Sequence, residues 1–259
     1  MLRVDQIGMN FGGVVALDDV SFSVDPGEIV GVIGPNGSGK STLINVMTGY
    51  YRPTSGSVSL DSETISGQTP EAIRQAGIAR TFQNLRLVQE MSVLENTVAG
   101  LYLQITGTCG LTQRWLADMF LTPAARRRSA VAREAAEAAL ERVGLHVKHD
   151  QTVSSLSYAD QKRLELARAI ALRPKVLVLD EPTAGMSVDE ADELIRMVTA
   201  LVESDDEPLS LFLVEHRLEL VLDVSHRAVV MDGGRVIADG LPEDVARDPH
   251  VRSIYVGGE

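Results

Sequence analysis

The chain has 259 residues, a formal net charge of −12 and a single cysteine, Cys109. The acidic balance argues against a general electrostatic affinity for nucleic acid or anionic lipid, and one cysteine excludes an internal disulfide. No stretch approaches the roughly 18 consecutive apolar residues of a membrane span, and no signal peptide is expected, because strand-like sequence follows Met1 directly. The length fits one large domain or a core with a subdomain.

The first part of the chain predicts two antiparallel strands and then a buried strand. Residues 2–7 and 20–24 alternate apolar and polar side chains, as strands with one buried face do. The turn at residues 25–27 leads into a predicted buried strand at residues 28–33. A helix is predicted over residues 41–48, so a glycine-rich segment is enclosed between a strand and a helix.

This enclosed segment fits the phosphate-binding pattern G-x-x-x-x-G-K-[ST]. Its residues are Gly34, Pro35, Asn36, Gly37, Ser38, Gly39, Lys40, Ser41 and Thr42. The glycines let the backbone form a concavity of N–H groups, and the following helix adds its positive end. In this pattern Lys40 reaches the β- and γ-phosphates and Ser41 holds Mg²⁺. An accidental glycine-rich turn is expected in only about 1% of chains of this size, so we expect a nucleoside triphosphate site.

The middle of the chain is predominantly helical in pattern. After predicted strands at residues 57–60 and 77–83, helices are expected at residues 93–103 and from Pro123 onwards. The second helix is predicted to bury a face made of Val131, Ala135, Ala138, Ala139 and Val143. We therefore expect a helical subdomain over residues 85–155, inserted into a nucleotide-binding core made of residues 1–84 and 156–259.

The last part of the chain alternates strands with helices. An apolar run at residues 176–179 predicts a buried parallel strand, and residues 210–214 predict a further strand. A helical stripe over residues 194–202 lies between them. Residues 232–234, Asp-Gly-Gly, indicate a hairpin turn between two further strands. This alternation favours an α/β fold with a mainly parallel sheet and right-handed crossovers.

Two carboxylates, Asp180 and Glu181, follow the apolar strand at residues 176–179. A strand that ends in this way places them at the carboxyl edge of the sheet, where the phosphate loop also opens. Asp180 is predicted to bind Mg²⁺ directly or through water. Glu181 is predicted to polarise a water for in-line attack on the γ-phosphate.

In its motifs the chain resembles the ATP-binding subunits of ABC transporters over nearly its whole length. The motifs are the phosphate loop, Gln83, Leu156-Ser157-Tyr158-Ala159-Asp160, Asp180-Glu181-Pro182-Thr183 and His216. The subfamily of branched-chain amino acid importers is the most similar, through Phe11-Gly12-Gly13, residues 79–83, Leu94-Glu95-Asn96, residues 163–169, Ala184-Gly185-Met186, Glu215-His216 and residues 234–240. The resemblance implies a phosphate-loop ABC ATPase core, with a mainly parallel sheet, an antiparallel β subdomain and an inserted α-helical subdomain.

The resemblance also implies roles for individual residues. Phe11 matches the aromatic residue that stacks on adenine, although it would otherwise be a hydrophobic residue of the first sheet. Gln83 matches the residue that senses Mg²⁺ and the attacking water and links the site to the membrane subunit. His216 matches the histidine that contacts the γ-phosphate. Ser157 and Ala159 match positions that face the nucleotide of the opposite subunit.

Four positions depart from the family pattern, namely Tyr158, Ala159, Asp160 and Ser187, and branched-chain importers commonly vary at the first of them. Ala159 replaces a glycine, and its Cβ can crowd a phosphate. Asp160 adds a negative charge that repels a phosphate unless the charge is paired or turned away, so ATP-driven closure of two identical chains is expected to be weakened. Ser157-x-x-Asp160 is also a capping box, so a plain helix start is the alternative. Ser187 stands where aspartate or asparagine is usual, which puts the coupling role of that loop in question.

The resemblance implies an ATPase subunit that uses ATP and Mg²⁺ to power import of branched-chain amino acids. The implied partners are membrane permease subunits, a second ATPase subunit, identical or homologous, and indirectly a solute-binding protein, but no nucleic acid. The implied location is cytoplasmic, peripheral on the inner face of the membrane. A non-transport ABC ATPase, a subunit for another solute and a nucleotide sensor without turnover are the alternatives.

Overall fold

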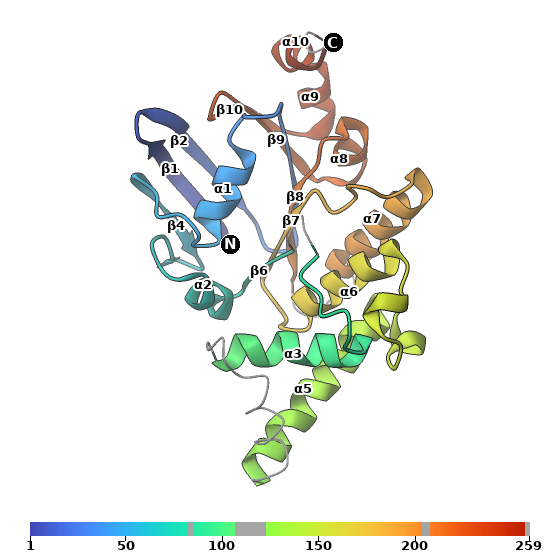
Figure 1. Cartoon of the computed structure of the whole chain (residues 1–259). Coiled ribbons are helices and arrows are strands. Elements are labelled where there is room, and N and C mark those ends of the chain that lie inside the picture. The colour runs from blue at the N-terminus through green and yellow to red at the C-terminus, as the bar shows by residue number, and fades with distance from the viewer. Residues whose placement is uncertain (82–84, 107–122, 204–207, 257–259) are drawn as a thin grey trace. The chain divides into compact units, whose positions relative to one another are not determined.

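The computed structural model describes residues 1–81, 85–106, 123–203 and 208–256 (Figure 1). Gln83 and Cys109 therefore lie outside the described residues. The chain divides into two compact units, one made of Met1–Gln83 with Pro174–Glu259 and the other of Asn84–Arg173. The second unit runs past the expected boundary at residue 155, because helix α6 (Tyr158–Ile170) packs against α3 (Val93–Thr106) and α5 (Pro123–Arg142).

The first unit contains an antiparallel sheet of order β2-β1-β4-β5. Its strands are β1 (Leu2–Phe11), β2 (Val14–Val24), β4 (Ser55–Leu60) and β5 (Glu63–Thr64). Leu2 and Val4 alternate with exposed residues along β1. A register irregularity between Val4 and Ile7, where Gln6 has a φ of +48°, allows Ile7 to be buried in the same core. The two strands predicted at the start of the chain are thus confirmed, and both extend beyond the predicted segments.

A second sheet in the same unit has the order β10-β9-β3-β8-β7-β6. Its strands are β3 (Ile29–Ile33), β6 (Ile78–Arg80), β7 (Val176–Asp180), β8 (Ser210–Val214), β9 (Arg227–Asp232) and β10 (Arg235–Gly240). All neighbours are parallel except β10, which forms an antiparallel hairpin with β9. β3, β7 and β8 are buried at every position, which explains their continuous apolar sequences. The predicted α/β fold with a mainly parallel sheet is confirmed.

The two sheets share one core with helix α1 (Lys40–Met47). Phe22 of β2 stacks on Phe212 of β8 with 5.6 Å between ring centroids, and Leu43 and Met47 of α1 are fully buried among the same residues. The other helices of this unit are α2 (Pro70–Ala76), α7 (Val188–Glu203), α8 (Leu218–Val224), α9 (Pro242–Arg247) and α10 (Pro249–Val256). Packing on both sheets holds α1, and with it the phosphate loop, in a fixed place (Figure 1).

The second unit is helical, with short 3₁₀ turns at His146–Lys148 and Val153–Ser155. The predicted buried face of α5 is confirmed at Ala139 and Val143 and is wrong at Val131 and Ala138, which are exposed. The helix buries Ala132, Ala136, Ala139, Leu140 and Val143, whereas Val131 is 65% exposed. An alanine-rich helix offers apolar positions on several faces, so periodicity alone does not select the one that packs against α3 and α6.

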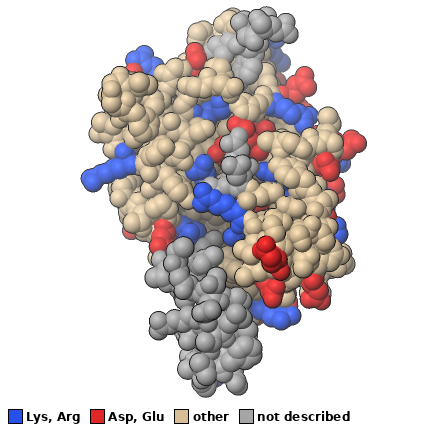
Figure 2. Space-filling view, in the orientation of Figure 1, with Lys and Arg blue, Asp and Glu red and all other residues tan. Residues whose placement is uncertain are grey.

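Two surface observations bear on function. No helix within the described ranges is long and apolar enough to cross a membrane. Both acidic and basic side chains occur on the face shown in Figure 2.

Candidate nucleotide site

The phosphate loop connects β3 to α1, and two of its glycines lie where no side chain fits. A Cβ on Gly34 would lie 2.2 Å from the carbonyl oxygen of Met231. Gly39, directly before α1, has a φ of +103°, and its Cβ would lie 2.8 Å from the carbonyl oxygen of Ala16. Both glycines therefore let the loop pack backbone to backbone against β2 and β9, which fixes its shape.

Lys40 lies inside this loop with 6% of its surface exposed. Its ammonium nitrogen donates to the carbonyl oxygens of Gly34 at 2.7 Å and Pro35 at 2.9 Å, and to Ser38 Oγ at 3.3 Å. Burial lowers the pKa of Lys40 below 10.5, while the negative charges of Glu181 and Asp180 oppose this shift. The loop thus holds a cation close to two carboxylates. Ser41 is exposed in the first turn of α1.

Glu181 and His216 lie together at the carboxyl ends of two neighbouring strands. Asp180, the last residue of β7, pairs in register with Val214, the last residue of β8. The residues that follow these two strands are therefore neighbours. Glu181 has a φ of +50° and donates its N–H to Val214 O at 2.9 Å. Its Oε1 lies 2.6 Å from Nε2 of His216.

Glu215 is a buried carboxylate beside this pair, and no role of its own was predicted for it from the sequence. It is 3% exposed, and its Oε1 accepts hydrogen bonds from Thr183 N at 2.9 Å and Thr183 Oγ1 at 2.7 Å. Its Oε2 accepts from His216 N at 3.3 Å. Glu215 therefore ties the loop after Glu181 to the end of β8. The sequence feature that could have identified Glu215 is the same as for Asp180. Each is a carboxylate at the end of a largely apolar strand.

Comparison with known proteins identifies the family. Residues 17–184 match a family model described as ABC transporter. The chain belongs to the ABC transporter ATPases. A second model, described as branched-chain amino acid ATP-binding cassette transporter, matches residues 235–259.

Several relatives of this ABC ATPase cover almost its whole length. It is 38% identical to the high-affinity branched-chain amino acid transport ATP-binding protein BraF of Pseudomonas aeruginosa, over 99% of this chain and 98% of BraF. It is 34% identical to the probable LivG of Methanocaldococcus jannaschii, over 99% and 97%. A solved ATP-binding cassette of an ABC transporter, in its ADP conformation, superposes with a TM-score of 0.85 at 35% identity, covering 100% of this chain and 99% of that one.

In this ABC ATPase, Phe11 lies at the end of β1 rather than in the core of the first sheet. It is 41% exposed. Its ring meets that of Tyr51 edge to face, with 5.2 Å between centroids and 75° between planes. An exposed aromatic pair of this kind is suited to stacking with a flat base. Tyr51 was not among the predicted site residues.

Ser157, Ala159 and Asp160 belong to the helical unit. Ser157 is the N-cap of α6, accepting from Asp160 N at 3.2 Å and donating to Asp160 Oδ2 at 3.0 Å. Lys148 Nζ donates to the same Oδ2 at 2.5 Å. The predicted capped helix start is confirmed, and the charge of Asp160 is paired. Gln83, the remaining predicted catalytic and metal-binding residue, lies outside the described residues.

The oxygen ligands of this site suit Mg²⁺. Ser41 offers a hydroxyl group, and Asp180 offers a carboxylate. Arg80 Nη2 donates to Oδ2 of Asp180 at 2.9 Å. Within the described residues no group of three or more His, Cys, Asp or Glu side chains could hold a metal alone. In nucleotide sites, however, the protein typically provides only one or two oxygen ligands to Mg²⁺, and the phosphates and waters provide the rest. One carboxylate and one hydroxyl group are enough for such a site.

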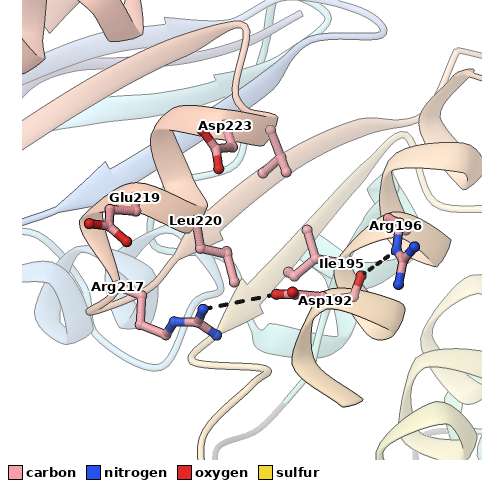
Figure 3. A pocket seen from close by; sticks show the side chains of 8 residues that line it. Asp192, Ile195, Arg196, Arg217, Glu219, Leu220 and Asp223 are labelled. Carbon is pink, nitrogen blue, oxygen red and sulfur yellow. Dashed lines mark hydrogen bonds and ion pairs between the residues drawn. The ribbon is translucent and has the colours of Figure 1, made fainter. Parts of the chain in front are cut away.

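A separate pocket of about 430 Å³ lies between α7 and α8 (Figure 3). It is lined by Asp192, Ile195, Arg196, Arg217, Glu219, Leu220, Asp223 and Val224. Arg217 Nη2 lies 3.9 Å from Asp192 Oδ1. None of the predicted site residues lines this pocket.

Proposed function

We propose that this ABC ATPase hydrolyses ATP to power the import of branched-chain amino acids. The contact between Glu181 and His216 beside a complete phosphate loop supports hydrolysis. The match of residues 235–259 to the branched-chain amino acid model supports the class of solute. The names of the full-length relatives point the same way.

In the proposed mechanism, the loop residues Gly34 to Thr42 bind the phosphates and Phe11 stacks on adenine. Ser41 and Asp180 hold Mg²⁺, which neutralises charge on the phosphates when it is bound. Glu181 accepts a proton from the attacking water as general base. His216, 2.6 Å from Glu181, holds that carboxylate in position and contacts the γ-phosphate. Gln83 senses the metal and the water.

The proposed assembly pairs two ATPase subunits, identical or homologous, on the cytoplasmic face of membrane permease subunits. In it Ser157 and Ala159 of each chain face the ATP bound by the other chain. Gln83 and the helical unit contact the permease, and a solute-binding protein delivers the amino acid from the other side. ATP binding closes the pair and hydrolysis reopens it.

Glu181→Gln tests the proposed chemistry. It is expected to lower the rate of ATP hydrolysis by about 10²–10⁴-fold, while the affinity for ATP changes by less than about threefold, because the loop is untouched. Hydrolysis is measured as phosphate release and affinity by calorimetry. A wild-type protein that binds ATP but releases no phosphate, even with its permease, would instead support a nucleotide sensor.

Transport in reconstituted vesicles tests the solute. The chain is combined with its permease and binding protein, and uptake of labelled leucine is compared with uptake of labelled ribose. Ribose is the relevant comparison, because a ribose import ATP-binding protein of Rubrobacter xylanophilus is 32% identical over the full chain, which spans 48% of that protein. ATP-dependent uptake of leucine but not ribose is expected.

A further inference from the structure

Arg80 is a partly buried cation for which the proposed chemistry has no role. It is the last residue of β6, and its side chain is 12% exposed. In the sheet it pairs with Val178 of β7. Its side chain extends to the end of β7, where Nη2 donates to Asp180 Oδ2 at 2.9 Å. The Asp180 side chain is 8% exposed. The carboxylate predicted to hold Mg²⁺ therefore has a partly buried protein counter-ion.

The other half of the guanidinium contacts the C-terminal end of α1. Nη1 donates to Asn45 Oδ1 at 2.7 Å and to Thr48 Oγ1 at 3.4 Å. The guanidinium carbon lies 5.8 Å from the centre of the Tyr50 ring, within the range of a cation–π contact. Helix C-termini favour cations, and α1 has no basic residue in its own last turn. Arg80 supplies that cation from a neighbouring strand.

These contacts join the two parts of the nucleotide site. Helix α1 begins at Lys40, in the phosphate loop, and ends beside Asn45 and Thr48. The guanidinium of Arg80 connects that helix to Asp180. Nη1 contacts α1 and Nη2 contacts Asp180 at the end of β7. A lysine ammonium group cannot reproduce this planar arrangement of two donors. The position of Asp180 is thereby fixed relative to the helix that carries the loop.

We propose that Arg80 is a positioning residue for the divalent-cation site. It holds Asp180 through Oδ2, in a fixed place relative to α1, and leaves the second carboxylate oxygen for the cation that arrives with ATP. The inference rests on the proposed function, because it takes Asp180 as a ligand of that cation. Partners that orient a metal-ligating carboxylate typically contribute ~10–100-fold to metal affinity.

The experiment measures metal affinity separately from nucleotide affinity. Mn²⁺ is titrated into the protein bound to a non-hydrolysable ATP analogue and followed by its electron paramagnetic resonance signal. The analogue is also titrated without metal, in the presence of a chelator. Arg80→Ala is expected to weaken Mn²⁺ binding by ~10–100-fold and to change the metal-free affinity by less than about threefold. Arg74→Ala is the matched control, because Arg74 lies in the same unit and pairs with Glu71. The Arg74→Ala protein is expected to bind Mn²⁺ as the wild type does.

Two milder variants keep the proposal testable if Arg80→Ala does not fold. Arg80→Lys keeps a charge but loses the second connection, and Asn45→Ala removes only the α1 end. Each variant is expected to weaken Mn²⁺ binding by at least about threefold. This effect is smaller than the ~10–100-fold weakening expected when the orienting partner is removed altogether. Wild-type Mn²⁺ affinity in both, or in a folded Arg80→Ala protein, overturns the proposal. An equal loss of metal-free affinity in Arg80→Ala also overturns it. A wild-type protein that binds no analogue would instead refute the proposed function.

Discussion

At the scale of single residues, buried carboxylates organise the ends of the central strands. Asp180 and Glu215 are both nearly inaccessible, and both have protein donors, Arg80 for the first and Thr183 for the second. A buried charge is tolerated only when it is paired or hydrogen-bonded. Glu181, which is partly buried, and His216, which is exposed, lie beside these fixed groups. The proposed catalytic groups are therefore supported by residues that do not react.

Glu215→Ala is expected to lower the free energy of unfolding by about 1–3 kcal/mol, because the buried N–H and hydroxyl of Thr183 lose their acceptor. Glu215→Gln is expected to cost less, since its amide oxygen still accepts both bonds. Urea denaturation measures the difference. Glu219→Ala, an exposed glutamate on α8, is the control and is expected to stay within about 0.5 kcal/mol of wild type. Equal effects of Glu215→Ala and the control would contradict the role given to Glu215.

Asp61 gives a pH-dependent prediction. Hydrogen bonds from Lys175 and then from the N-terminal amine lower the pKa of Asp61 from 3.8 to about 2. The folded state thus favours the ionised form, so its contribution to stability is complete above pH 3.8 and is lost as the pH falls through 2. Because the group is exposed, Asp61→Asn is expected to cost less than about 1 kcal/mol at neutral pH. Urea unfolding midpoints of the variant and the wild type should therefore converge as the pH falls from 3.8 towards 2. A difference between the two midpoints that grows as the pH falls would be inconsistent with this ion pair.

At the scale of elements, patterns with a local cause could be predicted from the sequence. The phosphate loop, the apolar strands and the hairpin at residues 232–234 each follow from local residue chemistry, and each is present. The Arg80 connection could not be predicted, because it depends on three elements that meet only in the folded sheet. For the same reason the sequence pattern led us to expect the helical subdomain to end at residue 155, whereas the second compact unit extends to Arg173. The pattern of α6 does not reveal that it packs against α3 and α5.

A pair of substitutions in α5 tests the observed register. Ala136 is fully buried and Ala138 is exposed, although the sequence pattern placed Ala138 on the buried face. Ala136→Leu is expected to destabilise by about 1–3 kcal/mol, because extra methylenes are forced into a packed interface. Ala138→Leu is the matched control and is expected to change stability by less than about 0.5 kcal/mol. Urea unfolding followed by circular dichroism measures the stability of both variants. A larger destabilisation by Ala138→Leu than by Ala136→Leu would instead support the buried face predicted from the sequence.

At the scale of the whole molecule, the predicted site residues are divided between the two units. The phosphate loop, Asp180, Glu181 and His216 belong to the first unit, whereas Ser157 and Ala159 belong to the second. In the proposed assembly each ATP is bound by the first unit of one chain and the second unit of the other. The charge at the N-terminus of α6 then bears directly on association, because it faces a triphosphate.

The pairing of Lys148 with Asp160 changes the expectation for that association. An unpaired Asp160 would repel the phosphate of the other chain, but its Oδ2 accepts from Lys148 at 2.5 Å and from Ser157 at 3.0 Å. The Asp160 side chain is only 11% exposed. The negative charge that was expected to weaken closure of two identical chains is therefore largely neutralised. This neutralisation depends on Lys148.

Dimerisation of the Glu181→Gln protein, which retains ATP, tests this dependence. Solution mass with ATP and Mg²⁺ is expected to show a dimer, and Lys148→Ala is expected to weaken it by at least about tenfold, since an uncompensated carboxylate then opposes the phosphate. Asp160→Asn added to Lys148→Ala should restore the dimer, because it removes the charge that Lys148 balanced. Lys175→Ala, which breaks an exposed Lys–Asp pair in the other unit, is the control. If Lys148→Ala dimerises like the control, or if Asp160→Asn gives no rescue, the charge of Asp160 does not govern closure, and its side chain acts only as part of the helix cap.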